Sequence, residues 1–120
     1  KLRWLMKVAV IGSRTLTVTD SQLAELLPEG TTEIISGGAV GVDTAAELYA
    51  DTHRISKHII LPDYGQYGRR APTVRDMRIV RLADIVVAIW DGTSTGTAFS
   101  IKYARELGKP VRVFRRQQVI

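Results

Sequence analysis

Short apolar runs rich in β-branched residues alternate along the chain with stretches in which apolar residues recur every three or four positions. The first pattern predicts buried strands and the second predicts amphipathic helices. Five strands are expected, at residues 6–12, 33–36, 57–62, 85–90 and 110–115. Strands that alternate with helices form parallel sheets, because each return to a parallel neighbour needs a crossover. The alternation therefore predicts an α/β fold with a five-stranded parallel sheet.

Helices are expected in the four gaps between these strands. Their expected extents are Thr19 to Pro28, about Gly41 to Thr52, around Thr73 to Ala83 and about Thr97 to Gly108. The run 85–89 is continuously apolar and suits a sheet covered on both faces, whereas the run 111–115 alternates and suits an edge strand. Together these features predict a single Rossmann-like three-layer domain, in which ligands bind outside the carboxyl ends of the strands.

Length and composition narrow the classes of protein that fit. A chain of 120 residues with 45% hydrophobic and 24% charged residues suits one globular domain. We expect an N-terminal extension at residues 1–5 and the domain at 6–120. No run reaches the roughly 18 apolar residues of a membrane span, so no membrane partner is expected. The absence of cysteine excludes disulfides and thiolate chemistry and fits the cytoplasmic location that we expect.

Positive charge is concentrated in the second half of the chain. The net charge is +5, but residues 1–52 carry four basic and seven acidic side chains, and the remainder carries thirteen and five. Five arginines lie close together in sequence, at positions 69, 70, 75, 78 and 81. The alternatives are an anion-binding surface and an ordinary solvated helix face.

Four strand-end segments supply the candidate ligand-binding residues. These are Gly12, Ser13, Arg14, Gly37, Gly38, Ala39, Gly41, Asp43, Pro62, Asp63, Asp91, Gly92, Ser94, Gly96 and Thr97, with Arg75 on the following helix. Carboxyl ends of parallel strands meet at one edge, so these segments are expected to converge. Loops without bulky side chains let backbone N–H groups approach a phosphate at a helix N-terminus, although the same glycines can serve as plain turn residues.

Charged residues among these candidates suggest individual roles. Arg14 and Arg75 are expected to neutralise phosphate, with a surface ion pair as the alternative for Arg14. Asp63 or Asp91 is expected to contact sugar hydroxyls. Catalytic residues are not identified, and Arg75 and Asp91 are the candidates.

Several familiar sites are missing. The sequence has no G-x-x-x-x-G-K-[ST], which excludes the P-loop mechanism, and Ser36 stands where a dinucleotide-binding domain carries an acid. The two histidines have no third partner, so no metal and no obligatory cofactor is expected.

The motifs in order resemble the SLOG superfamily. They are Gly12-Ser13-Arg14, the segment from Ser36 to Asp43, Pro62-Asp63, Arg75 with Met77, Ala83-Asp84 and the segment from Trp90 to Thr97. The likeness is greatest to the YspA-type (YpsA-related) branch, and the superfamily includes the LOG phosphoribohydrolases and DprA. It implies a Rossmann-like domain that senses or processes nucleotide-derived ligands, often as a homo-oligomer.

Two relatives suggest different activities. Arg75 and Gly96-Thr97 match LOG positions, but Ser100 stands where the LOG enzymes carry a glutamate, and Asp76 departs from the Arg-Asn pair of the YspA-type branch. The Gly-x-Arg start and the 36–43 loop resemble DprA. The expected function is therefore binding of a nucleotide or a nucleotide-derived small anion. The alternatives are a nucleoside-monophosphate N-glycosidase, and DprA-like binding of single-stranded DNA, a nucleic-acid partner.

Overall fold

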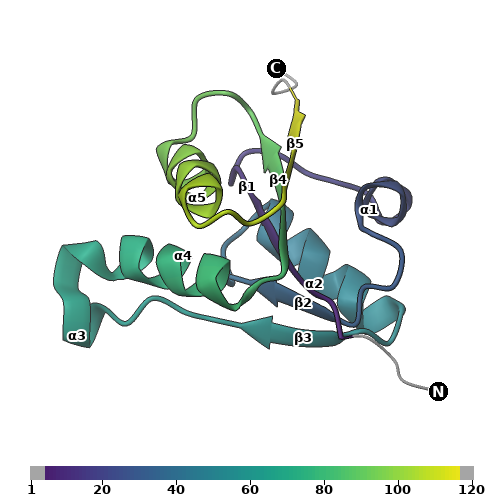
Figure 1. The fold of residues 1–120 in the computed structure, drawn as a ribbon, viewed down its shortest axis with the longest axis horizontal. Coiled ribbons are helices and arrows are strands. Elements are labelled where there is room, and N and C mark those ends of the chain that lie inside the picture. The colour runs from purple at the N-terminus through teal and green to yellow at the C-terminus, as the bar shows by residue number, and fades with distance from the viewer. Residues whose placement is uncertain (1–4, 117–120) are drawn as a thin grey trace.

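The computed structural model describes residues 5–116 and shows one α/β domain with helices on both faces of a parallel sheet (Figure 1). The strands are β1 (Lys7–Gly12), β2 (Glu33–Ser36), β3 (Ser56–Ile59), β4 (Ile85–Trp90) and β5 (Val111–Arg115). The helices are α1 (Asp20–Leu26), α2 (Val42–Thr52), α3 (Tyr64–Tyr67), the 3₁₀ turn η1 (Gly68–Arg70), α4 (Ala71–Leu82) and α5 (Thr95–Glu106). The expected extension at residues 1–5 lies outside the described residues except for Leu5.

The sheet is wound in two directions from its central strand. Its order is β3-β2-β1-β4-β5 and every neighbouring pair is parallel. Val8 of β1 is paired with Ile34 on one side and Ile85 on the other, so β1 has a partner along both edges. The expected doubly wound parallel sheet is confirmed, and β5 is an edge strand as predicted.

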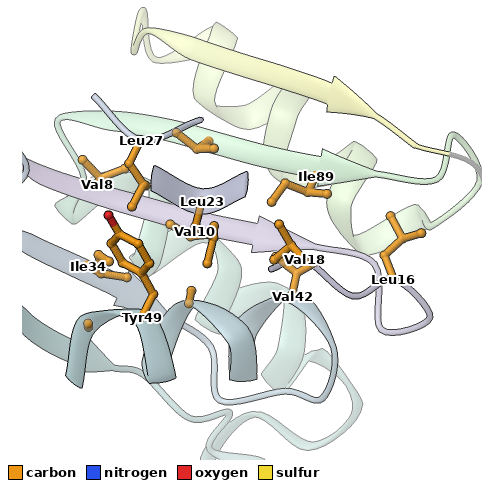
Figure 2. Close-up of a cluster of buried hydrophobic side chains, with 13 residues drawn as sticks. Val8, Val10, Leu16, Val18, Leu23, Leu27, Ile34, Val42, Tyr49 and Ile89 are labelled. Atoms are coloured by element: carbon orange, nitrogen blue, oxygen red, sulfur yellow. The ribbon is translucent and has the colours of Figure 1, made fainter. Parts of the chain in front are cut away.

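Two apolar layers hold the helices against the sheet. Figure 2 shows the layer under α1 and α2, where Leu23 and Tyr49 pack with Val8, Val10 and Ile89. The opposite layer joins α4 and α5 to alternate residues of the same strands, with Ile79, Ile101 and Ala88 among its members. The central strands β1 and β4 are buried on both faces, which explains their continuous apolar sequences.

Capping chemistry sets the start of α1, the helix expected from Thr19. The Thr19 side chain accepts a hydrogen bond from the Gln22 amide at 3.1 Å, and the Gln22 side chain accepts one from the Thr19 amide at 2.9 Å. This is a capping box, which satisfies two amides at the helix start that have no partner within the helix.

The segment between β3 and α4 differs from the prediction. Strand β3 ends at Ile59 rather than residue 62, and helical structure begins at Tyr64 rather than near Thr73. Asp63 accepts the amide hydrogen of Gln66 at 3.1 Å and so starts α3, and Gly68, at φ +56°, ends it. Both are ordinary helix signals, but a four-residue helix has no apolar periodicity to reveal it.

No helix among the described residues is long and apolar enough to cross a membrane.

Candidate functional site

A cavity of about 420 Å³ opens at the carboxyl ends of β1 and β4. The chain leaves β1 toward the face covered by α1 and leaves β4 toward the face covered by α5. Ligand sites of doubly wound sheets lie where neighbouring strands diverge in this way. We call this cavity the carboxyl-edge pocket.

Most of the predicted site residues line the carboxyl-edge pocket. They are Gly12, Ser13, Arg14, Gly37, Ala39, Asp43, Arg75, Asp91, Ser94, Gly96 and Thr97. The expectation that strand-end loops from distant parts of the sequence would converge therefore holds for three of the four loops.

Five predicted residues are not among those that line the pocket: Gly38, Gly41, Pro62, Asp63 and Gly92. Gly41 is the N-cap of α2 at φ +82°, and Asp63 is the N-cap of α3. Gly38 and Gly92 also have positive φ, which a residue with a Cβ rarely adopts. The three glycines therefore set the backbone course of the loops, and Asp63 caps a helix.

The floor of the pocket holds a buried carboxylate, Asp43, which is only 7% exposed. One of its oxygens accepts the amide hydrogen of Ala39 at 3.2 Å, which closes the loop before α2. Burial raises the pKa of Asp43 to about 6, and this effect exceeds the opposing effects of the Ala39 amide and the Arg75 charge. Asp43 is therefore half-ionised near pH 6.

Arg75 is committed to partners within the protein. Its Nε donates to Asp76 Oδ1 at 2.7 Å and its Nη1 donates to the Gly37 carbonyl at 2.6 Å. Its side chain is 9% exposed, and that of Asp76 is 19% exposed. Burial raises the pKa of Asp76, although the Arg75 charge beside it lowers that pKa in part. The positive charge of Arg75 is thus largely compensated before any ligand arrives.

Arg14 is the pocket arginine that is available to an anion. It is exposed at the end of β1, and among residues 5–116 no carboxylate pairs with it within 4.0 Å. Its charge is felt by Asp76, whose pKa it lowers. The expected alternative, an ion pair that occupies Arg14, is not formed by these residues.

The loop after β4 is held in shape by Asp91. One oxygen of Asp91 accepts the amide hydrogens of Thr93 and Ser94, both at 2.8 Å, and these bonds lower its pKa to about 2. Ser13, fully buried, accepts the Asp91 amide hydrogen at 3.1 Å and so ties this loop to β1. Asp91 therefore stays ionised and orders the loop. The sugar contact and the catalytic role that the sequence suggests for it stay predictions.

The N-terminus of α5 opens into the pocket. Ser94 is its N-cap but makes no side-chain bond to the helix amides, and Thr95, Gly96 and Thr97 form the first turn and line the pocket. The first amides of a helix have no partner within the helix and carry partial positive charge. With Arg14 they make this part of the pocket favourable for an anion. The Asp76 carboxylate, which is paired with Arg75, lies close by, 3.8 Å from where a Cβ of Gly96 would be.

Sequence reasoning left some lining residues out of the predicted site. They are Ile11, Thr15, Pro72, Asp76, Ile79, Thr95 and Ser100. Asp76 could have been found from its place beside Arg75, and Ser100 from its place one helical turn after Thr97. The apolar members gave no such signal.

The arginine cluster of the sequence is divided in space. Arg75 lies in the pocket, whereas Arg81 lies near the other end of α4 and donates to the Tyr103 hydroxyl at 3.1 Å. Arg69 and Arg70 are exposed on η1, next to the start of α4. Only part of the cluster therefore lies at the carboxyl edge.

Comparison with known proteins finds a family match and a match of the fold. The family model of DNA recombination-mediator protein A matches residues 1–63. A search of curated proteins finds no match.

Two solved structures share the fold. DNA processing protein A (DprA) from Streptococcus pneumoniae superposes with a TM-score of 0.73 at 21% identity, covering 91% of this chain and 50% of that one. A DNA processing protein A from Helicobacter pylori, described for its single-stranded DNA binding mode, gives 0.72 at 24% identity, covering 93% and 66%. The chain thus spans between half and two thirds of the length of these proteins.

Proposed function

Since the chain belongs to the DNA recombination-mediator protein A family, we propose that it binds single-stranded DNA in the carboxyl-edge pocket. Family membership agrees with the resemblance to the SLOG superfamily. The YspA-type branch, the relation to LOG enzymes, homo-oligomer formation and a cytoplasmic location stay predictions.

The observation that carries the proposal is the unequal state of the two pocket arginines. Arg75 is compensated by Asp76, whereas Arg14 is exposed beside the first turn of α5. A phosphodiester has a single negative charge and several acceptor oxygens, so one arginine and a set of backbone amides match it. The acidic floor repels a second phosphate and leaves that region to a sugar or a base.

Replacement of Arg14 tests this assignment. Arg14→Ala is expected to weaken binding of a fluorescein-labelled 12-residue oligothymidylate about tenfold or more, because a charge-assisted hydrogen bond is lost. Fluorescence anisotropy at fixed salt measures the dissociation constants. Arg105→Ala, at an exposed arginine in the last turn of α5, is the matched control and should bind like the wild type. Equal binding by Arg14→Ala and the control would contradict the proposal.

A free nucleotide is a second candidate ligand, favoured by the size of the pocket. About 420 Å³ falls within the range of roughly 300–1,000 Å³ that is usual for small-molecule sites. In this proposal, the phosphate lies against Arg14 and the α5 amides, and the sugar hydroxyls lie against Asp43 or Asp91.

Hydrolysis of an N-glycosidic bond is a further alternative, for which Arg75 and Asp91 are the candidate catalytic residues. Ser100, 2% exposed in the pocket, carries no carboxylate for it.

A further inference from the structure

Residues Tyr64–Arg70, which form α3 and η1 and which we call the arm, lie beyond the sheet on the side of the carboxyl ends of β2 and β3 (Figure 1). All seven residues of the arm are exposed. Tyr64 is 59% exposed and Tyr67 is 41% exposed, and neither belongs to the two apolar layers of the domain. The arm therefore has no part in the described core, yet it presents two aromatic rings to solvent.

The arm is flanked by residues at or near the carboxyl-edge pocket. Before the arm, Leu61 packs on Gly38 so closely that a Cβ there would lie 2.6 Å from Leu61 Cδ2. After it, Pro72 lines the pocket itself, and Arg75 follows within the same helix. Pro72 follows Arg70 by two residues, so the C-terminal end of the arm lies next in sequence to the wall of the pocket.

The arm also carries charge that nothing in the described chain neutralises. Arg69 and Arg70 are exposed, and within residues 5–116 no carboxylate lies within 4.0 Å of either guanidinium. Asp63, which precedes the arm, uses one oxygen to cap α3. Aromatic rings beside unpaired arginines are the combination that holds single strands, because bases stack on the rings and phosphates pair with the arginines.

We propose that the arm extends the DNA-binding surface, with bases of a single strand stacking on Tyr64 and Tyr67 and its phosphates pairing with Arg69 and Arg70. This inference rests on the proposed function, since the strand reaches the arm from the carboxyl-edge pocket. It assigns recognition of bases to the arm and recognition of one phosphate to the pocket.

The test compares two double variants with the 12-residue oligothymidylate. Tyr64→Ala/Tyr67→Ala should weaken binding about tenfold or more, since stacking of each base contributes substantially to affinity. Tyr64→Phe/Tyr67→Phe keeps both rings and is expected to bind within about twofold of the wild type. Thermal unfolding by circular dichroism checks that both variants fold. An alanine variant that folds and binds like the wild type would overturn the proposal.

A second pair of substitutions gives an independent readout. Arg69→Ala/Arg70→Ala should reduce the slope of log K against log salt by about 1.4, because each phosphate contact with a single strand contributes about 0.7. An unchanged slope overturns the arginine part of the proposal, even if the tyrosine variant is unstable. If Arg14→Ala weakens binding and no arm variant does, the inference fails and the proposed function stands. If the wild type binds no oligothymidylate, both fail.

Discussion

Asp43 is a carboxylate whose ionisation costs free energy in the folded protein. It lies almost fully buried in the floor of the pocket, and one amide and one neighbouring arginine offset only part of the desolvation. A buried acid of this kind prefers its neutral form, so its folded-state pKa of about 6 lies above the ordinary value of 3.8. The stability that Asp43 contributes is therefore fully present below about pH 3.8 and is lost as the pH rises through 6.

Replacement of this residue should remove that pH dependence. Asp43→Asn keeps the shape and the acceptor for Ala39 but cannot ionise. Relative to this variant, the free energy of unfolding of the wild type is expected to fall by roughly 2 kcal/mol between about pH 4 and pH 7.5. Urea unfolding at several pH values measures it. Asp51→Asn, at an exposed position of the same helix, is the control. Parallel pH profiles of the wild type and Asp43→Asn would disprove the effect.

The loop before α2 depends on a close approach between two segments. Gly41 has φ +82°, and a Cβ at this position would lie 2.6 Å from the carbonyl oxygen of Arg14. The backbone of the Arg14 segment therefore lies against the N-cap of α2, and this contact helps to place Arg14 at the pocket. Gly41 thus helps to position Arg14 by letting the two backbone segments come close, although it has no side chain of its own.

A comparison of substitutions at Gly30 and Gly41 separates the free-energy cost of a positive φ from the cost of the close contact. Gly30 has a similar φ of +86°, but a Cβ at that position would have open space around it, with no neighbouring atom within 4 Å. Gly30→Ala is expected to cost roughly 1 kcal/mol, and Gly41→Ala roughly 2 kcal/mol more, because overlap with backbone cannot be relieved by a rotamer change. Urea unfolding measures both, and Gly41→Ala should also weaken DNA binding. Equal destabilisation by the two substitutions would show that the contact contributes nothing.

The protein carries more positively charged residues than the proposed DNA-binding surface uses. The sequence carries 17 basic residues, and we assign three of the arginines that are exposed among residues 5–116, Arg14, Arg69 and Arg70, to DNA. Others serve the fold, such as Arg116, which donates to the Thr17 carbonyl and the Gln22 side chain. Net charge alone therefore overstates the number of phosphates that the domain holds.

The salt dependence of binding tests this count. Three phosphate contacts predict a slope of log K against log salt of about −2 for a single strand, whereas coating by all the basic residues would give a slope several times steeper. Anisotropy titrations of oligothymidylate over about 50–300 mM NaCl give the slope, and mixed-sequence strands should give the same value. A slope of about −6 or steeper would refute the assignment to three arginines.

Local sequence patterns determined most of the fold. Short apolar runs marked the five strands, and apolar residues at helical spacing marked the main helices, because each of these signals depends on residues a few positions apart. The convergence of the loops after β1, β2 and β4 also followed from sequence, since a parallel sheet places all carboxyl ends at one edge. The short helix α3 escaped prediction because it is too brief to show a period.

Only the tertiary structure decided which charges are free. The sequence does not show that folding buries Arg75 against Asp76 and the Gly37 carbonyl and leaves Arg14 exposed. The same holds for Asp43 and Asp91, whose pKa values lie on opposite sides of the ordinary value because one is desolvated and the other accepts two amide hydrogens. Some of the partners are local in sequence, since Asp76 is next to Arg75, and Thr93 and Ser94 follow Asp91 closely. Burial depends on distant segments, such as Gly37, which lies 38 residues from Arg75. The desolvation of these groups is therefore set only when the loops meet.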